Sequence, residues 1–300
     1  MINEKPLISI IVNCFNGEKY LREALSSILD QSYKNWEVIF WDNQSTDSSA
    51  EIYKSFKDKR FKYFYSNEHT SLYKARNLAI ERAQGDFISF LDTDDLWDKK
   101  KLEALMPYFK EPDVGVVFGN IWLVKKNIEK KKLHAINQLP RGKVYDDLIK
   151  NYNISIISNI IRKNFYLKLD KKFDERFNFI GDFDLFLRLS KICKFESIQE
   201  PIAYYRLHGR NLTTINKEKE VEEFELWLKE NKNNLKNFQI ENFKNKIKYK
   251  EFVNCKIDGN YRKCINMILN KEISLLNLKN LLIFFTPILF LKKLLWYHQD

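Results

Sequence analysis

Between residues 7 and 124 the chain alternates short apolar runs with longer segments whose apolar side chains recur at helical spacing. The runs LISIIVN, WEVIFWD, FKYFYS and DFISFLD are rich in β-branched and aromatic residues, which is typical of buried strands. The segment NGEKYLREALSSILDQ between the first two runs has the pattern of an amphipathic helix. Strands that alternate with helices form βαβ units, so the sequence predicts an open, mostly parallel α/β sheet.

Polar residues follow several of these predicted strands. Asn13, Asp42, residues 66–67 and residues 92–95 each come directly after an apolar run. Ligands of open α/β sheets bind outside the carboxyl ends of the strands. We therefore expect these side chains to lie along one edge of the sheet.

The pattern changes further along the chain. Residues 140–210 alternate less regularly, with a helix predicted in DFDLFLRLSKIC and a strand in FESIQEPIAYYRLH. After residue 211 the sequence is rich in Lys, Asn and Glu and is predicted to be helical. We predict a domain over residues 1–212, with halves of about 1–124 and 125–212, and a helical extension over residues 213–300 that is a candidate for membrane association.

Composition limits the classes of partner. The net charge of +11 suits nucleic acid, an anionic membrane or a phosphorylated ligand. Nucleic acid is the weakest of these, because the densest lysine cluster, KKNIEKKKLH, has no aromatic residues within it. The four cysteines have no zinc spacing and no dense disulfide pattern, which favours a cytoplasmic protein. The short apolar run near the N-terminus is interpreted as a strand and not as a signal peptide.

Two carboxylates, Asp92 and Asp94, directly follow a predicted buried strand. Residues i and i+2 at a strand end point to the same side, and two such carboxylates repel unless a cation lies between them. Mg²⁺ and Mn²⁺ prefer carboxylate oxygens and leave coordination positions for phosphates, so a metal site is predicted here. The alternative is a polar turn that caps the next helix, and this is the role we expect for Asp95.

Three further candidates each have a structural alternative. Asp42 could accept hydrogen bonds from a base or ribose, although the local sequence DNQSTD favours a turn with a helix cap. Arg76 could neutralise a diphosphate or lie on a solvated helix face. The segment YYRLHGRNLT contains Arg206 and His208 beside aromatic residues, which suits a diphosphate group, but a solvated loop is the alternative.

The predicted helix in GDFDLFLRL contains Asp182 and Asp184. Residues i and i+2 do not share a helix face, so one carboxylate should face a cleft while the other caps the helix or pairs with Arg188. A carboxylate that faces a nucleotide site can act as a general base on an acceptor hydroxyl. The alternative is an acid of the first turn that interacts with the helix dipole.

Taken in this order, the segments resemble glycosyltransferase family 2, whose members use nucleotide-sugars and have the Rossmann-like GT-A fold. The resemblance is carried by the segments ISIIVNCFNGEKYLREALSSILDQSYKNWEVIFWDNQSTD, ARNLAIERAQGDFISFLDTDDLW, GDFDLFLRL and YYRLHGRN, roughly residues 6–212. It implies an inverting enzyme that moves one sugar, with a UDP-sugar favoured, to a hydroxyl of a saccharide or lipid-linked acceptor in surface polysaccharide biosynthesis. The chain lacks the QxxRW motif of processive synthases.

The resemblance also implies roles for single residues. Asn13, Phe15 and Asn16 would line the nucleobase pocket, and Asp42 would bind the base. Asp94 would ligate Mn²⁺ or Mg²⁺ directly.

Further roles follow from the same resemblance. Asp92 would contact the ribose or the metal, and Arg76 would lie near the nucleotide. Asp182 would be the general base, and Arg206 and His208 would close over the diphosphate.

The chain departs from the family pattern at several positions. Gly181 stands where the family usually has Glu, and Asn13 and Cys14 replace Pro and Thr. Two alternatives remain: a nucleotidyltransferase on a similar fold, and a non-catalytic nucleotide-sugar binding module. The first usually has a glycine-rich loop after the first strand, whereas NCFNGEKY has one Gly.

The C-terminal tail contains the apolar run LLIFFTPILFL, residues 281–291, which Pro287 interrupts. This run is too short to span a bilayer. The flanking Lys279, Lys292 and Lys293, with Trp296 and Tyr297, fit a helix pair that lies in the interface of an anionic membrane at the inner face of the cytoplasmic membrane. The alternative is that these helices pack on the catalytic domain or on a second copy of the chain.

Overall fold

The computed structural model describes residues 5–125, 130–274 and 277–294. The chain divides into two compact units, Met1–Arg206 and Leu207–Asp300. The division lies close to the predicted boundary at residue 212.

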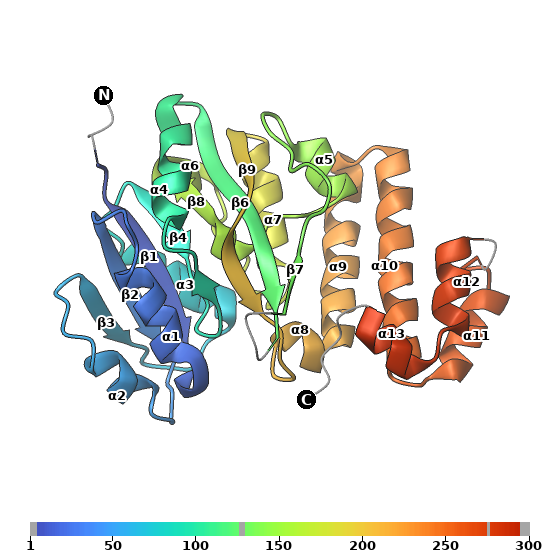
Figure 1. Ribbon diagram of the computed structural model, residues 1–300. Helices are drawn as coiled ribbons and strands as arrows, with labels where there is room; N and C mark the ends of the chain where they lie inside the picture. The colour runs from blue at the N-terminus through green and yellow to red at the C-terminus, as the bar shows by residue number, and fades with distance from the viewer. Residues whose placement is uncertain (1–4, 126–129, 275–276, 295–300) are drawn as a thin grey trace. The chain divides into compact units, whose positions relative to one another are not determined.

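The first unit is built on one mixed sheet with the strand order β3-β2-β1-β4-β8-β6-β9-β5, in which β7 also pairs with β6 (Figure 1). The strands are β1 (Ile8–Cys14), β2 (Trp36–Asp42), β3 (Phe61–Tyr65), β4 (Phe87–Phe90), β5 (Leu96–Trp97), β6 (Val114–Val124), β7 (Lys131–Leu133), β8 (Asn159–Arg162) and β9 (Lys194–Arg206).

The N-terminal half of this sheet is parallel, as predicted. Strand β1 pairs in parallel with both β2 and β4, and β2 pairs in parallel with β3. The second half is mixed, since β8 runs antiparallel to β4 and β6, and β5 runs antiparallel to β9. The central strands are apolar on both faces, and Ile10, Val38 and Ile88 are fully buried.

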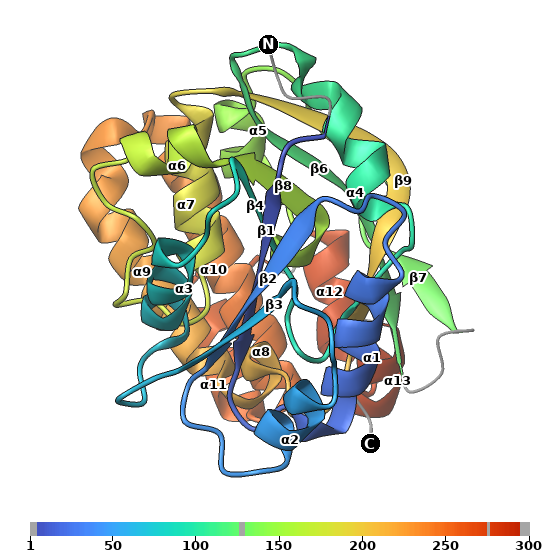
Figure 2. The same ribbon diagram turned by 90° about the vertical axis from the view of Figure 1, so that its left-hand side faces the viewer.

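Helices cover both faces of the sheet. Figure 2 shows α3, α6 and α7 on one side and α1 and α4 on the other. The helices of this unit are α1 (Glu18–Leu29), α2 (Ser49–Lys54), α3 (Leu72–Glu81), α4 (Lys101–Leu105), α5 (Tyr145–Lys150), α6 (Lys163–Lys168) and α7 (Gly181–Ser190), with 3₁₀ turns η1 (Met106–Lys110) and η2 (Ile156–Ser158). Buried residues of α1 recur at helical spacing, which explains why the pattern in the sequence located this helix.

The second unit is helical, as predicted. Its elements are α8 (Leu212–Ile215), α9 (Lys217–Asn231), η3 (Lys232–Asn234), α10 (Asn237–Ile257), α11 (Tyr261–Leu269), α12 (Leu278–Phe285) and α13 (Ile288–Leu294). An apolar cluster that includes Phe252, Cys264, Ile283 and Leu291 joins α10, α11, α12 and α13. Within the described residues, none of the helices is long and apolar enough to cross a membrane.

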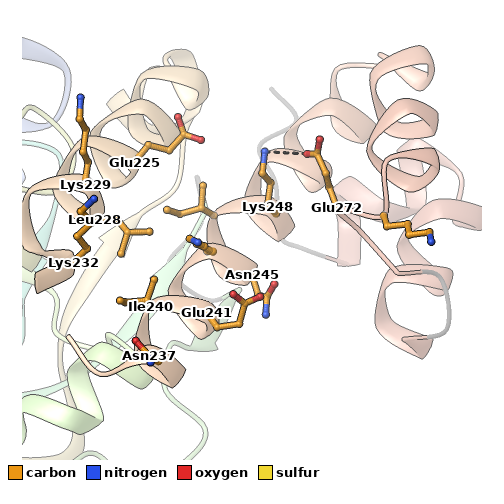
Figure 3. A pocket seen from close by; sticks show the side chains of 13 residues that line it. Glu225, Leu228, Lys229, Lys232, Asn237, Ile240, Glu241, Asn245, Lys248 and Glu272 are labelled. Carbon is orange, nitrogen blue, oxygen red and sulfur yellow. Dashed lines mark ion pairs between the residues drawn. The ribbon is translucent and has the colours of Figure 1, made fainter.

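A groove in the second unit lies between α9 and α10 and extends to residues 271–272 (Figure 3). Lysine and glutamate side chains line much of it, and Lys248 forms an ion pair with Glu272 at 3.0 Å. None of the site residues predicted from the sequence lines this groove.

Candidate active site

The sheet topology brings the predicted polar residues to one edge. Strand β1 lies between β2 and β4. The chain adds β2 and then β3 on one side of β1 and returns to place β4 on the other side, so the strand order reverses between β1 and β4. Ligands of open α/β sheets bind at such a switch point, outside the carboxyl ends of the strands. Asn13 near the end of β1, Asp42 at the end of β2 and Asp92 after β4 all lie at this edge.

The loop that follows β1 packs directly against the loop that contains Asp92 and Asp94. A Cβ atom at Gly17 would lie 2.9 Å from the Oγ1 atom of Thr93, so only glycine fits between the two loops. Asn16 adopts a φ of 53°, and its Oδ1 atom accepts the backbone N–H of Thr46 at 2.8 Å. These contacts bring the predicted nucleotide-binding and metal-binding loops together.

Asn13 and Phe15, two of the residues predicted to contact the base, have side chains that can receive a ligand. Both polar side-chain atoms of Asn13 are buried, and neither has a hydrogen-bond partner among the described residues. Buried polar atoms are normally paired, so this amide is suited to receive a ligand group. Phe15 is 53% exposed, and its ring centroid lies 4.3 Å from that of His69.

The Asp42 side chain stabilises the turn that follows β2. Its side chain is fully buried, and its carboxylate accepts the backbone N–H of Ser45 at 2.7 Å and the hydroxyl of Tyr63 at 2.6 Å. Burial and the neighbouring Asp42 charge raise the pKa of Tyr63. This geometry matches the turn that the local sequence favoured, and contact with a base stays a prediction.

Arg76 and Asp92 form an ion pair. A guanidinium nitrogen of Arg76, on α3, lies 2.6 Å from the Asp92 carboxylate. Arg76 is 2% exposed, which excludes the alternative of a solvated helix face. Burial opposes the charge of Arg76, but Asp92, Tyr73 and Asp182 together outweigh burial, so the pKa of Arg76 is raised. The sequence predicted a metal ion as the cation that balances Asp92 and Asp94. Arg76 supplies part of this positive charge.

The prediction that Asp95 caps the following helix is wrong. Asp95 is 1% exposed, and its carboxylate accepts the backbone N–H of Arg206 at 2.7 Å. Helix α4 begins only at Lys101, and its N-cap residue is Lys100. Asp95 turns inward because the antiparallel pairing of β5 with β9 brings the end of β9 beside it.

Arg206 fixes the same loop from the other side. Its Nε atom donates to the carbonyl oxygen of Asp94 at 3.0 Å, and another guanidinium nitrogen contacts Glu23 at 2.8 Å. The side chain is almost fully buried. Its predicted contact with a diphosphate stays a proposal.

His208 belongs to the second unit. Its backbone N–H donates to Asn211 at 2.6 Å, and its Nδ1 atom accepts the backbone N–H of Arg210 at 3.2 Å. The ring thus helps to form the turn before α8. A role at the diphosphate stays a prediction.

Asp182 and Asp184 have different surroundings, as predicted for residues two apart on a helix. Asp184 pairs with Arg188 at 2.7 Å. Asp182 lies in the first turn of α7, where its Oδ1 accepts the hydroxyl of Tyr73 at 3.3 Å and its Oδ2 that of Tyr152 at 3.0 Å. Burial raises the pKa of Asp182, while Arg76 and the two phenols oppose this rise. A carboxylate with this balance is suited to accept a proton.

Sequence reasoning missed both tyrosines. Tyr73 is one residue among several apolar ones on α3, and Tyr152 lies in an irregular segment before η2. The one sequence signal for Tyr73 was Gly181, because a residue without a side chain leaves space into which a neighbouring ring can pack.

The residues at this edge fit a divalent metal only together with a ligand. Asp94 is partly exposed and the Asp92 side chain is 30% exposed. Within the described residues, no group of three or more His, Cys, Asp or Glu side chains could hold an ion alone. A hard cation that is bound by one or two carboxylates takes its remaining oxygen ligands from substrate phosphates and water. The donor set present here is of that kind.

Comparison with known proteins now adds to this geometry. Residues 9–188, more than half of the chain, match the model of the family described as Glycosyl transferase family 2. The chain belongs to glycosyl transferase family 2. The match includes β1 to β4, the Asp92–Asp94 loop and most of α7.

One relative is the UDP-Glc:alpha-D-GlcNAc-diphosphoundecaprenol beta-1,3-glucosyltransferase WfgD from Escherichia coli. It is 32% identical over 155 residues, which are 52% of this chain and 60% of the length of WfgD. For several curated relatives the match spans less than two thirds of their length, from 47% to 64%.

Solved structures share the GT-A fold. TarS of S. aureus in complex with UDP-GlcNAc has a TM-score of 0.62 at 21% identity, over 74% of this chain and 65% of TarS 1-349. The mannosyltransferase PcManGT from Pyrobaculum calidifontis, in complex with GDP-Man and Mn2+, has a TM-score of 0.58 at 16% identity, over 76% of this chain and 65% of its own. The predicted fold class is confirmed.

Proposed function

We propose that this family 2 protein transfers a single sugar from a nucleoside diphosphate sugar, with a UDP-sugar favoured, to an acceptor hydroxyl. The observation that carries the proposal is the position of Arg76. Its buried guanidinium pairs with Asp92 and interacts electrostatically with Asp182 as well. One cation therefore links the predicted metal-binding loop to the predicted base.

The chain's own residues account for the steps of an inverting displacement. Asn13, Phe15 and Asn16 are proposed to line the nucleobase pocket. Asp42, which accepts the backbone N–H of Ser45 in the adjoining turn, is proposed to bind the base. Asp182 takes the proton from the acceptor hydroxyl as that oxygen attacks the anomeric carbon. Arg206 keeps the Asp94 loop in place and is proposed to act at the leaving diphosphate.

Asp94 and Asp92 would hold a divalent metal, Mn²⁺ or Mg²⁺. When bound, such an ion neutralises charge on the departing diphosphate. In support, the distant structural relative PcManGT was solved with GDP-Man and Mn2+.

The names of relatives support the choice of acceptor. WfgD, and a second Escherichia coli relative named WfaP, are named for transfer of glucose from UDP-Glc to GlcNAc-diphosphoundecaprenol. We propose a saccharide or lipid-linked acceptor of the same general class, within bacterial surface polysaccharide biosynthesis, at the inner face of the cytoplasmic membrane.

A donor screen tests the proposal. Thermal shift and donor hydrolysis are measured with uridine-, thymidine- and guanosine-diphosphate sugars, with and without Mn²⁺. We expect stabilisation and slow hydrolysis with a uridine donor, and both should depend on the metal. No response to any of the nucleotide-sugars would contradict the proposal.

A further inference from the structure

Two phenols hold the proposed base from opposite ends. Tyr73, on α3, is 3% exposed and donates to Oδ1 of Asp182, while the half-buried Tyr152 donates to Oδ2. Each carboxylate oxygen thus accepts one phenol hydrogen bond, and the backbone N–H of Phe183 also acts on this carboxylate. Donors at both oxygens fix the plane of the carboxylate.

The ring of Tyr73 also explains the glycine beside Asp182. A Cβ atom at Gly181 would lie 2.5 Å from the Cδ2 and Cε2 atoms of Tyr73, closer than van der Waals contact allows. The ring has little freedom to move, because it stacks on Phe173 at 5.1 Å and the Arg76 guanidinium lies 5.1 Å from its centroid. No side chain fits at position 181 while Tyr73 stays in place.

We propose that Tyr73 and Tyr152 are positioning residues that orient Asp182 toward the acceptor hydroxyl, and that Tyr73 fills the place of the side chain that Gly181 lacks. This inference rests on the proposed function, in which Asp182 is the base.

Electrostatics gives this arrangement a measurable consequence. The groups that favour the charged form of Asp182 are Arg76 and Tyr73 from α3, Tyr152 from the segment before η2, and the backbone N–H of Phe183. Asp92 in turn acts on Tyr73 and Arg76. Burial raises the pKa of Asp182, and hydrogen bonds from the phenols favour its charged form. Removal of a phenol hydroxyl should therefore raise this pKa further. The acidic limb of the rate profile, where the base is lost, should move to higher pH.

The test compares Tyr73→Phe and Tyr152→Phe in the full-length protein, assayed for sugar transfer from the donor found by the screen. Each change removes one hydroxyl and keeps the ring. We expect kcat to fall roughly tenfold in each variant, with the KM of the donor unchanged, because a hydrogen bond to a charged group is lost. The acidic limb of the kcat profile should shift to higher pH in both.

Tyr166→Phe is the matched control. Tyr166 is also buried, and its hydroxyl donates to Asn77 at 2.9 Å, away from Asp182. This variant should keep the wild-type kcat and pH profile. If all three variants lose turnover equally with unchanged pH profiles, the tyrosines have only a structural role and the inference is overturned.

A double-mutant cycle tests the pairing of Gly181 with Tyr73. Gly181→Ala alone should lower turnover, because the new methyl group displaces the ring. In the Tyr73→Ala background the same change should have little further effect. Additive effects in the cycle would show that ring and glycine act independently, against the inference.

Asp182→Asn separates this inference from the proposed function. If the wild-type chain transfers sugar and Asp182→Asn retains that turnover, the base assignment fails, whatever the tyrosines do. If Asp182→Asn is inactive but Tyr73→Phe and Tyr152→Phe behave as wild type, the base stands and only the phenol pair is excluded.

Discussion

The residues of the candidate site act as pairs. Arg76 balances Asp92, the Asp95 carboxylate receives the backbone of Arg206, and Tyr73 donates to Asp182. In each pair the partners come from different elements. A substitution at one residue therefore changes the geometry of another element as well as the local charge.

Replacement of Arg76 by Met should lower both stability and activity. The change leaves the Asp92 carboxylate without its cation in a site that is only partly open to solvent. We expect the free energy of unfolding to fall by about 2–3 kcal/mol, below the cost for a fully buried pair. Urea unfolding measures this. Arg82→Met is the control and should cost little, because Arg82 is the exposed C-cap residue that follows α3.

Asp94→Asn should weaken metal-dependent nucleotide binding while the fold persists. Loss of a direct carboxylate ligand should reduce the Mn²⁺-dependent affinity for UDP by at least about tenfold, as measured by calorimetry. Asp113→Asn removes the same charge at an exposed position and should leave this affinity unchanged. Equal affinity of wild type and Asp94→Asn would show that Asp94 does not touch the metal.

Single residues were predicted well where sequence neighbours determine them. The pairing of Asp184 with Arg188 depends only on helical spacing, and the structure confirms it. The role of Asp95 was wrong because its partner, Arg206, is more than a hundred residues away and arrives through the pairing of β9 with β5. The phenols on Asp182 were missed for the same reason.

At the scale of elements, the period of the apolar pattern located β1 to β4, β9, α1 and α7 of the first unit. Helix α3 ends at Glu81, and Gly85 lies in the segment between this helix and β4. A Cβ at Gly85 would lie 2.6 Å from the carbonyl oxygen of Leu7, so close packing against the chain before β1 requires this glycine. The antiparallel strands of the second half could not be predicted, since periodicity does not encode strand direction.

Lys101 of α4 should make stability depend on pH. It is fully buried, donates to the Ser89 hydroxyl at 2.6 Å, and burial lowers its pKa well below the usual value. Between the folded and the unfolded pKa the unfolded state binds more protons, so stability should rise with pH in this window. Urea unfolding at pH 7 and pH 9 measures the rise. Lys101→Met should reduce it, and an equal rise in both proteins would contradict this account.

At the scale of the whole molecule, the family match covers most of the first unit and none of the second. The family match ends at residue 188, within the first unit, so the second unit has no role from this comparison. Its helices α12 and α13 expose Leu282, Phe285, Leu289 and Phe290, while Ile283 and Leu291 are buried in its own core. Trp296 and Tyr297, predicted membrane anchors, lie outside the described residues.

These exposed side chains lead us to propose that the tail contacts an anionic membrane. Full-length protein should float with vesicles that contain phosphatidylglycerol, and less with neutral vesicles. Phe285→Ser with Phe290→Ser should weaken binding at least about tenfold, because two apolar side chains are lost. Ile136→Ser with Phe238→Ser removes two other exposed apolar residues as a control. Unchanged flotation of the tail variant would exclude this surface.

The central claim is that Asp182 serves as the base in a single displacement at the sheet edge. The anomeric configuration of the transferred sugar, compared by NMR between donor and product, tests it most directly. The account predicts inversion at the anomeric carbon, with no product from Asp182→Asn. Retention of configuration would contradict it.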